Sequence, residues 1–541
     1  MTEPPTAVSV LLQYLEGEGV DHIFGIPGGP LMPLYEALFE RGSITPILAK
    51  HEQGAAFMAD GYCRASGHPG VVVVTTGPGA TNTLTPLVES YAGSQPVLVV
   101  MSDIPSALIG KDLGALHEVP NQIDCFKPVC RWAETLRDAR AIPGAVQGAF
   151  HLFRSGRPGP IALSIPTDLL TASVEAQLTP GASGRRPPCE VRLIEDASSR
   201  LRSARRPLII SGGGAVSADA SAELEALAER LRAPVVTTVM GRGIIPETRP
   251  LWLGVLPNRR ATQAAIEAAD VILAVGCRFA HRSTRGLLLN LAFRPDQTLI
   301  HLDLDATVIG KMYPPTLGIV GDARDGLGGI VKALGPGPGI SDWDWSWLET
   351  LRAARGPRYS KDVERLITVL RETLAPDAIV VNDQTGINYW MEWHFPVLRP
   401  RTFLYPVGSA TLGYAVPAAL GAKLACPERQ VVAVVGDGGF LFSVNELATA
   451  VKYGLGVLFL VLNDQRMGAI KWLQEALYGR WGEAELTNPD FPALAQAFGL
   501  EGQRVERLDD LPQALSKALG HPGPVLLELR LAIDPPWELS S

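Results

Sequence analysis

Two acidic residues stand directly after apolar runs in the last third of the chain. Asp437 follows the run 431–435 within a GDGG sequence, and Asp464 follows the run 457–462 within an Asn-Asp pair. Twenty-four residues separate the GDG and Asn-Asp sequences, which is enough for one helix and a return strand. Because open parallel sheets bind ligands at the carboxyl ends of their strands, this spacing predicts both acids at one edge of a sheet.

The residue types at that edge fit a magnesium ion beside a phosphate. Mg²⁺ binds through one or two carboxylates and takes its other ligands from phosphate and water. Gly438 and Gly439 let the backbone approach a pyrophosphate closely. Either acid alone is more typical of a capped turn. The pair, with each acid after a fully apolar run, favours a metal–phosphate site.

The first third of the chain carries a second group of candidate residues. Glu52 opens a helical pattern, where the helix dipole alone also explains an acid. The apolar run 71–76 then leads into the turn 77–82, which ends at Asn82 and has no long side chains. A flat ring could lie against such a turn.

Other phosphate-binding motifs are incomplete. The chain has no GxxxxGK[ST] sequence. Residues 212–214 are three glycines that follow an apolar run and precede a helical pattern, but the full GxGxxG motif is absent. They are equally consistent with a cofactor loop and with a tight turn.

The elements that must position these residues are predicted to be strands alternating with helices. The 541 residues correspond to about three domains. Nine runs are apolar on both faces, as in parallel strands covered by helices on both sides. The fold class is therefore α/β with three doubly wound parallel-sheet domains. Pro/Gly-rich breaks at 179–188 and 335–339 divide the chain into domains 1–178, 189–334 and 345–541. The nine runs are 71–76, 97–102, 161–165, 207–211, 271–276, 379–382, 431–435, 457–462 and 525–531.

Composition excludes several classes of protein. The net charge is −8 without a long basic run, so no nucleic-acid partner is expected. Six scattered cysteines indicate a reduced, cytoplasmic protein. The N-terminus has no signal-peptide pattern. Residues 402–422 are uncharged and long enough to cross a bilayer, but their prolines and glycines favour buried protein interior over a membrane span.

Taken together, the motifs resemble the thiamine diphosphate (ThDP) enzymes of the acetolactate synthase and 2-oxo acid decarboxylase superfamily. The resemblance covers nearly the whole chain, and the motifs stand in the family's order. They are FGIPGG (24–29), HEQGAAFMADGYCR (51–64), TTGPGATN (75–82), GRPGPIALSIPTD (156–168), TLGYAVPAALGA (411–422) and the GDG and Asn-Asp sequences around Asp437 and Asp464.

The resemblance implies a role for each matching residue. Glu52 corresponds to the glutamate that hydrogen-bonds the aminopyrimidine ring and favours the tautomer that deprotonates the thiazolium. Leu412 corresponds to the apolar residue that forces the cofactor rings into a V. Asp437 and Asp464 correspond to the Mg²⁺ ligands, together with the backbone carbonyl of Arg466. The other implied cofactor contacts are Pro27, Asn82, Gly438, Gly439 and Met467.

The resemblance also implies the assembly and the reaction. Pyrimidine-binding, central and pyrophosphate-binding domains are expected. The two cofactor halves are expected on different subunits of a homodimer or homotetramer. The expected activity is decarboxylation of a pyruvate-like 2-oxo acid followed by carboligation, as in acetolactate synthase.

Several residues depart from the synthase pattern. Leu473 stands where biosynthetic synthases have a Trp, and the stretch 467–473 is closer to benzoylformate decarboxylases. His117 replaces an active-site amide, so it is a candidate proton carrier or a loop histidine. The chain also ends soon after 525–531. The expected substrate pocket contains Gly28, Gly29, His117, His281, Ala469, Ile470 and Leu473.

These departures keep alternatives open. Non-ligating decarboxylation of a larger or aromatic 2-oxo acid is one, and a flavin-linked oxidase of pyruvate oxidase type is another. A protein that binds the cofactor without catalysis is disfavoured, because Glu52 is retained together with both metal acids. FAD is undecided: Gly213, Gly214, Arg278 and Arg282 match its site in the central domain, whereas Ala280 replaces an Asp.

Overall fold

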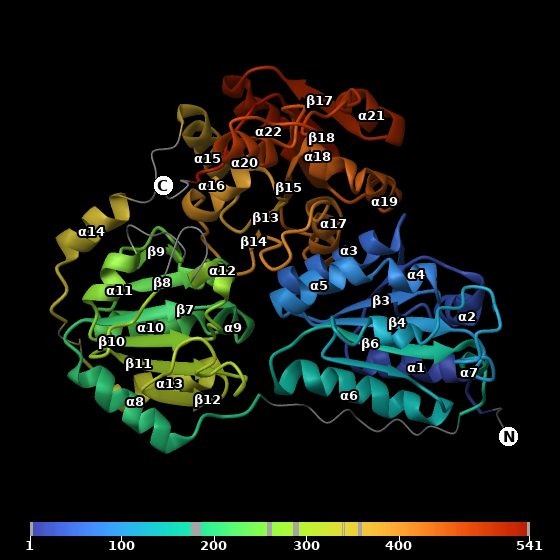
Figure 1. The fold of residues 1–541 in the computed structure, drawn as a ribbon, viewed down its shortest axis with the longest axis horizontal. Helices are drawn as coiled ribbons and strands as arrows, with labels where there is room; N and C mark the ends of the chain where they lie inside the picture. Colours follow the sequence, from blue (N-terminus) through green and yellow to red (C-terminus); the bar gives the residue numbers. More distant parts are fainter. Residues whose placement is uncertain are drawn as a thin grey trace.

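The computed structural model describes residues 4–174, 186–256, 262–284, 291–337, 339, 341–354 and 360–537. Three six-stranded sheets follow one another along the chain, and every strand pairing in them is parallel. Figure 1 shows the N-terminal domain in blue, the central domain in green and the C-terminal domain in orange and red. This is the predicted α/β class. Most of the predicted linker 179–188 and residue 338 of the second lie outside the described residues.

The N-terminal domain has the strand order β2-β1-β3-β4-β6-β5. Its strands are β1 (His22–Gly25), β2 (Thr45–Leu48), β3 (Gly70–Val74), β4 (Val97–Asp103), β5 (Trp132–Thr135) and β6 (Ile161–Pro166). Its helices are α1 (Ala7–Gly17), α2 (Met32–Arg41), α3 (Glu52–Ser66), α4 (Pro78–Thr81), α5 (Leu84–Gly93), α6 (Ile142–Ser155) and α7 (Thr167–Leu170).

The central domain has the order β12-β11-β10-β7-β8-β9, which is the order of dinucleotide-binding sheets. Its strands are β7 (Pro207–Ser211), β8 (Val235–Thr238), β9 (Trp252–Leu256), β10 (Val271–Val275), β11 (Thr298–Asp303) and β12 (Leu317–Val320). Its helices are α8 (Val191–Ser203), α9 (Gly213–Ser217), α10 (Ser221–Leu231), α11 (Ala264–Ala268), α12 (His281–Thr284) and α13 (Ala323–Leu334), and α14 (Trp345–Ala353) packs beside β9.

The C-terminal domain has the order β14-β13-β15-β16-β18-β17. Its strands are β13 (Ile379–Asn382), β14 (Phe403–Leu404), β15 (Val431–Gly436), β16 (Val457–Leu462), β17 (Glu501–Val505) and β18 (Val525–Leu529). Its helices are α15 (Lys361–Thr373), α16 (Gly386–His394), α17 (Ala415–Ala425), α18 (Asp437–Leu441), α19 (Leu447–Lys452), α20 (Gly468–Tyr478), α21 (Phe491–Phe498) and α22 (Leu511–Leu519).

All nine predicted strands are present, as β3, β4, β6, β7, β10, β13, β15, β16 and β18. Strands such as β3, β10 and β16 are buried at every position. They read as unbroken apolar runs because helices cover both faces of each sheet.

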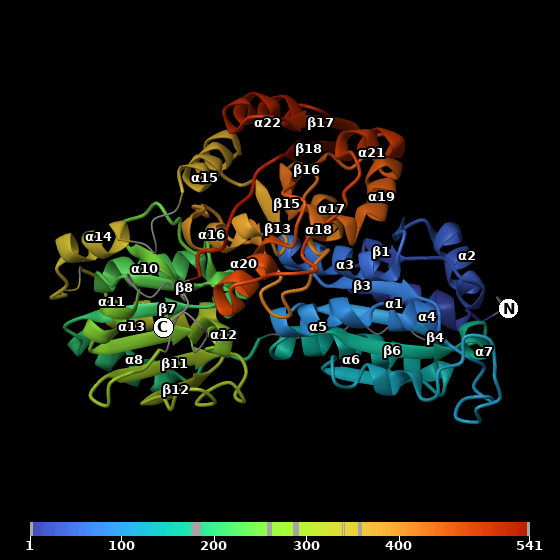
Figure 2. The same ribbon diagram turned by 45° about the horizontal axis from the view of Figure 1, so that its top comes forward.

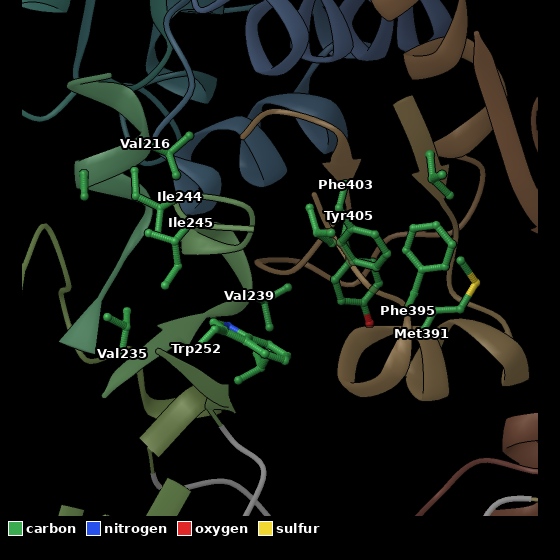
Figure 3. Close-up of a cluster of buried hydrophobic side chains, with 14 of the residues drawn as sticks. Val216, Val235, Val239, Ile244, Ile245, Trp252, Met391, Phe395, Phe403 and Tyr405 are labelled. Carbon is green, nitrogen blue, oxygen red and sulfur yellow. The ribbon is translucent and has the colours of Figure 1, made fainter. Parts of the chain in front are cut away.

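The C-terminal domain shares a hydrophobic core with each of the other domains. Figure 3 shows Val239 and Trp252 of the central domain facing Phe395, Phe403 and Tyr405 of the C-terminal domain within one buried cluster. A second cluster joins the N- and C-terminal domains through α3 and α17, which lie side by side in Figures 1 and 2.

Helices α3 and α17 run antiparallel at very close range. A Cβ atom added at Gly61 would meet the carbonyl oxygen of Ala418 at 2.1 Å, and one added at Gly421 would meet that of Met58 at 1.9 Å. Only glycine permits this approach. The uncharged stretch 402–422 therefore ends in a helix buried against α3, as predicted. Among the described residues, no helix is long and apolar enough to cross a membrane.

Candidate functional site

Asp437 and Asp464 line one pocket at the carboxyl edge of the C-terminal sheet. Gly436 of β15 pairs with Leu462 of β16, so the residues that follow the two strands emerge together. The pocket has a volume of about 230 Å³, and its lining lies between residues 384 and 533. It also contains Leu412, Gly438, Gly439, Arg466, Met467, Ala469 and Ile470. We call it the C-terminal pocket.

The two carboxylates are held by short local contacts. Oδ1 of Asp437 accepts the backbone N–H of Gly438 at 2.9 Å, and Oδ2 accepts the N–H of Gln465 at 2.8 Å. Oδ2 of Asp464 accepts from Nε of Arg466 at 3.0 Å. Burial raises the pKa of both acids, and the charge of Asp464 raises that of Asp437 further.

A cation would relieve the repulsion between these two acids. The described residues contain no cluster of three His, Cys, Asp or Glu side chains that could hold a metal without further ligands. The donor set therefore fits a hard ion that completes its shell with backbone, phosphate and water oxygens.

Two residues that lie behind this pocket, outside its lining, escaped the sequence predictions. The amide of Asn488 donates to Oδ2 of Asp437 at 2.7 Å. Asp383, which follows β13, is fully buried, and burial raises its pKa to about 6. It accepts the backbone N–H groups of Gly413 at 3.2 Å and Ala415 at 2.9 Å, so it fixes the turn after Leu412. Its sequence signal, an acid after an apolar strand, is the same one that identified Asp437.

The predicted residues of the N-terminal domain gather around the turn 77–82. Glu52 is the first residue of α3, and Nδ2 of Asn82 donates to its Oε2 at 2.9 Å. A Cβ added at Gly79 would lie 3.4 Å from Oε1 of Glu52. Gly28 lies against Thr75, and a Cβ there would be 3.1 Å from that of Thr75. The preceding Pro27 is exposed.

His117 packs against Gly77, the first residue of the same turn. Its backbone has φ 65°, and a Cβ added at Gly77 would meet its carbonyl oxygen at 2.5 Å. Gln122, which the sequence predictions missed, fixes the start of this turn. Its Oε1 accepts from Oγ1 of Thr76 at 2.8 Å and from the N–H of Gly77 at 2.7 Å. The side chain of His117 is half-buried.

Glu52 and Leu412 lie at opposite ends of the α3–α17 pair. Glu52 begins α3, whereas Leu412 stands just before α17, and the two helices run antiparallel. Tyr414 contacts Asp60 and Arg64, which lie eight and twelve residues after Glu52 on α3, and this corresponds to about 12–18 Å of helix. One chain therefore presents the N-terminal turn and the C-terminal pocket as two separate half-sites.

Comparisons with known proteins agree with this division. Residues 5–125 match the N-terminal TPP binding domain of thiamine pyrophosphate enzymes, residues 194–330 the central domain, and residues 366–529 the C-terminal TPP binding domain. The chain belongs to the thiamine pyrophosphate enzyme family.

Relatives in this family carry different activities. A probable acetolactate synthase large subunit of Methanocaldococcus jannaschii is 34% identical over 97% of this chain and 91% of its own length. A probable 2-ketoarginine decarboxylase of Pseudomonas aeruginosa is 37% identical over 97% of this chain and 94% of its own length. The large subunit of acetolactate synthase isozyme 3 of Escherichia coli is 34% identical over 95% and 92%.

The predicted substrate-side residues of this family member fall in three places. Ala469 and Ile470 line the C-terminal pocket. Leu473, on the next turn of α20, is half-buried and lies outside that lining, while Trp472 packs edge-on against Trp537 at 5.9 Å. Gly28, Gly29 and His117 belong to the N-terminal half-site.

His281 lies apart from both half-sites within one chain. It is exposed and begins α12 of the central domain, next to Ala280 and Arg282.

Ala280 and Arg282 belong to a central cleft of about 380 Å³ between the three domains. Eight arginines line it: Arg64, Arg154, Arg157, Arg186, Arg242, Arg278, Arg282 and Arg401. Burial, with a contribution from Arg278, lowers the pKa of Arg157 to about 10.

The glycines of this cleft have a structural role of their own. A Cβ added at Gly212 would meet the carbonyl oxygen of Gly276 at 2.2 Å, and one at Gly214 would lie 2.6 Å from the Cα of Gly276. Close packing between the ends of β7 and β10 thus requires the glycines.

Proposed function

We propose that this ThDP-family enzyme decarboxylates a small, pyruvate-like 2-oxo acid with Mg²⁺ and ligates the product to a second carbonyl, as acetolactate synthases do. The observation that carries the proposal is the pairing of Glu52 with Asn82 in one half-site and of Asp437 with Asp464 in the other. Acetolactate synthases among the relatives support the ligation step.

The residues of the two half-sites fit ThDP and Mg²⁺. Asp437, Asp464 and the carbonyl of Arg466 would hold the ion, and the ion would hold the pyrophosphate against Gly438 and Gly439. Bound ThDP supplies a carbon nucleophile and a ring that takes up the electrons released with CO₂.

The chain's own residues would orient that cofactor. Glu52 would accept a hydrogen bond from a pyrimidine N–H through one carboxylate oxygen, while Asn82 donates to the other and fixes its direction. Leu412, held by the turn that Asp383 fixes, would wedge the two rings together. Met467, whose Sδ would lie 2.9 Å from a Cβ at Gly438, closes the wall beside the phosphates.

We propose that a second copy of the chain completes the site, in a homodimer or homotetramer. The separation of Glu52 from Leu412 along α3 and α17 supports this assembly. A second copy that sets its N-terminal turn over the C-terminal pocket would bury the exposed Pro27. His117 would then face the substrate, as a candidate proton carrier.

The pocket favours small apolar substrates over cationic ones. Apart from Asp437 and Asp464, which the metal would occupy, its described lining contains no acidic side chain. A guanidinium group, as in 2-ketoarginine, would therefore find no counter-charge on this side of the site. Leu473 in place of Trp supports the second candidate, non-ligating decarboxylation of a larger apolar 2-oxo acid.

A panel of 2-oxo acids distinguishes these activities. Acetolactate from pyruvate, with CO₂ release, would support ligation. An aldehyde as the sole product would favour the second candidate, and turnover of 2-ketoarginine alone would contradict both.

The oxidase alternative requires a flavin in the central cleft, whose arginines could pair with a diphosphate. Arg278 and Arg282 are among them, and Gly213 and Gly214 lie at its wall. The visible absorption spectrum of the purified protein tests this directly. A flavin spectrum together with oxygen uptake on pyruvate would favour the oxidase alternative.

A cytoplasmic location is also proposed. All six cysteines are free thiols, in keeping with a reducing compartment.

A further inference from the structure

Two buried glutamates each accept hydrogen bonds from the backbone of the other domain, next to a residue that is proposed to contact the cofactor. Glu446 belongs to the C-terminal domain, in the 3-10 turn Val444–Glu446. Its Oε1 accepts the backbone N–H groups of Lys50 at 3.0 Å and His51 at 3.1 Å, the two residues before Glu52. A Cβ added at Gly54 would overlap this carboxylate, at 2.2 Å from Oε1.

Glu89 makes the matching contact in the opposite direction. It lies on α5 of the N-terminal domain, and its Oε2 accepts the N–H groups of Gly408 at 3.1 Å and Ser409 at 2.7 Å. The hydroxyl of Ser409 donates to the same oxygen at 2.9 Å. These residues lead directly into Leu412.

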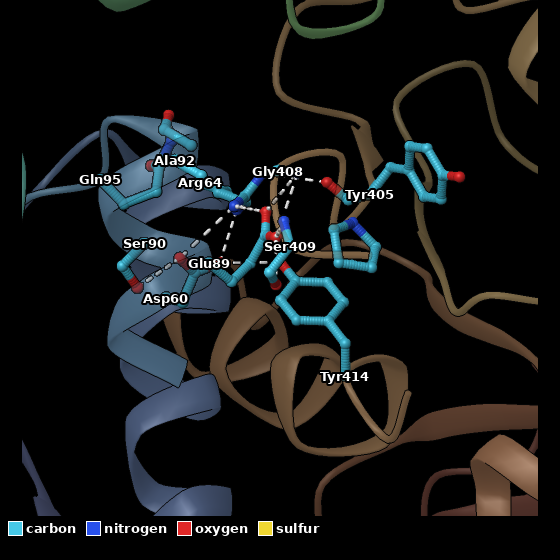
Figure 4. A network of polar contacts seen from close by, with 12 residues as sticks. Asp60, Arg64, Glu89, Ser90, Ala92, Gln95, Tyr405, Gly408, Ser409 and Tyr414 are labelled. Carbon is cyan, nitrogen blue, oxygen red and sulfur yellow. Dashed lines mark hydrogen bonds and ion pairs between the residues drawn. The ribbon is translucent and has the colours of Figure 1, made fainter. Parts of the chain in front are cut away.

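Arg64 and Asp60 complete the contact around Glu89. Figure 4 shows Arg64 between Glu89 and Asp60, with Ser409 and Tyr414 on the facing segment. Arg64 donates to Oε1 of Glu89 at 2.9 Å and to the carbonyl oxygen of Tyr405 at 3.1 Å. The hydroxyl of Tyr414 donates to Asp60 at 2.9 Å. Residues 405–414 are thus held at several points by the N-terminal domain.

Both glutamates are completely buried. Burying a carboxylate is unfavourable unless hydrogen bonds and counter-charges replace water. Neither domain alone supplies all of these partners, so each glutamate reaches its full set only when the two domains are docked. The docked state and the position of the two backbone segments are therefore linked.

We propose that Glu89 and Glu446 are a reciprocal pair of positioning residues. Glu446 sets the position of Glu52, and Glu89 sets the position of Leu412. This inference rests on the proposed roles of Glu52 and Leu412. Neither glutamate needs to touch the cofactor.

The test is the rate of hydrogen–deuterium exchange at C2 of ThDP bound to the holoenzyme. Glu446→Ala and Glu89→Ala are expected to slow exchange by about ten- to a hundredfold, the scale of a misplacement of about 1 Å. Glu446→Gln is expected to restore the rate to within about threefold of the parent. Its amide oxygen can accept both N–H groups while its nitrogen donates to the hydroxyl of Thr449, which contacts Glu446 at 2.7 Å.

Glu247→Gln is the matched control. Glu247 is a buried glutamate of the central domain that pairs with Arg242 of the same domain at 2.7 Å and accepts the backbone N–H of Val397 of the C-terminal domain at 3.0 Å. It makes no hydrogen bond to segment 408–412. This variant should lose stability yet keep the parent exchange rate. An equal slowing in Glu247→Gln would overturn the inference, because general loss of stability would then explain all the effects.

Two benchmarks separate this inference from the proposed function. Glu52→Gln and Leu412→Ala must themselves slow exchange, and parent rates in both would refute the proposed function. If both are slow while Glu446→Ala and Glu89→Ala exchange like the parent, the positioning role is wrong. If Glu89→Ala does not fold, Ser409→Ala takes its place, because it removes only the hydrogen bond from the Ser409 hydroxyl to Glu89. It is expected to slow exchange by about threefold, and a parent rate would contradict the positioning role of Glu89.

Discussion

The N- and C-terminal domains have the same strand order but present different chemistry at equivalent positions. In each, the second strand lies at one edge and the sixth beside the fourth. Helices α3 and α17 each follow the second strand of their sheet. Gly421 follows Gly61 by 360 residues, and Ala418 follows Met58 by the same number, so the two close contacts between these helices are related by a local two-fold.

Under the same offset of 360 residues, Leu412 corresponds to Glu52. The N-terminal domain therefore places the carboxylate of Glu52 at the start of its helix, with Asn82 as a partner. The C-terminal domain places the apolar side chain of Leu412 at the corresponding position. The carboxyl edges differ as well: the N-terminal domain carries a glycine turn, and the C-terminal domain carries two acids. The shared scaffold determines where a residue stands, while its side chain decides the chemistry.

The sharpest test of this comparison mixes two inactive variants. Glu52→Gln removes the proposed proton partner of one half-site, and this variant alone should lose activity by about 10²–10⁴-fold. Asp437→Ala disables the other half-site. If half-sites combine across two chains, random mixing gives dimers with one intact site and recovers about a quarter of the parent activity. A mixture as inactive as its components would show that one chain builds the whole site.

A second test compares the two acids within the C-terminal half. Asp437→Ala should abolish Mg²⁺-dependent binding of ThDP, since the pyrophosphate would then face buried acids without a counter-ion. Asp464→Asn should be mild, because an amide oxygen can still ligate the ion. Calorimetric titration of ThDP into both variants measures this. The reverse order of effects would mean that the two roles are interchanged.

The local two-fold itself can be tested through its glycines. Gly61→Ala and Gly421→Ala each push a methyl group into a backbone carbonyl and should destabilise the protein by about 1–3 kcal/mol. Urea unfolding of both variants should give similar losses. Gly17→Ala, at a position with nothing within 4 Å, is the control. Unequal losses at 61 and 421 would show that the two contacts are not equivalent.

The last test concerns a pH dependence that the C-terminal domain carries through Asp383. Its folded pKa of about 6 exceeds the ordinary value of 3.8, so the folded state binds the proton more tightly. Its contribution to stability is present below about pH 4 and is lost as pH rises towards 6, by about 3 kcal/mol. The free energy of unfolding of Asp383→Asn, relative to the parent, should change by that amount between these pH values. A difference that does not vary with pH would refute the assignment.

Much of this architecture could be predicted from apolar runs. Buried strands such as β16 have no polar position, and the proposed metal ligands Asp437 and Asp464 stand at the ends of such strands. Most strands that escaped prediction are short or lie at sheet edges: β14 has two residues, and β17 reads EGQRV with exposed positions. Weak periodicity over so few residues carries little signal. The exception is β11, an interior strand of six residues whose run includes His301 and Asp303.

The missed site residues have a different cause. Glu446 contacts His51 across 395 residues of sequence, and Glu89 contacts Ser409 across 320. Nothing local distinguishes them from surface glutamates, because their burial depends on the docking of two domains. Gln122 holds the turn at Gly77 across 45 residues. Such contacts follow from tertiary structure alone.

The burial of α3 also has a consequence for synthesis of the chain on the ribosome. Twelve of its fifteen residues are buried, several of them against α17. About 350 residues separate the two helices, so at about 5–20 residues per second α3 waits roughly 20–70 s for its partner. During that interval the nascent N-terminal domain exposes an apolar helix face to the cell, and Asp60 and Arg64, which pair with each other at 2.5 Å, still lack their partners Tyr414 and Tyr405. Shortening the chain that separates α3 from α17, or slowing translation of the central domain, should therefore change the yield of native protein. The stability of the finished fold should change less.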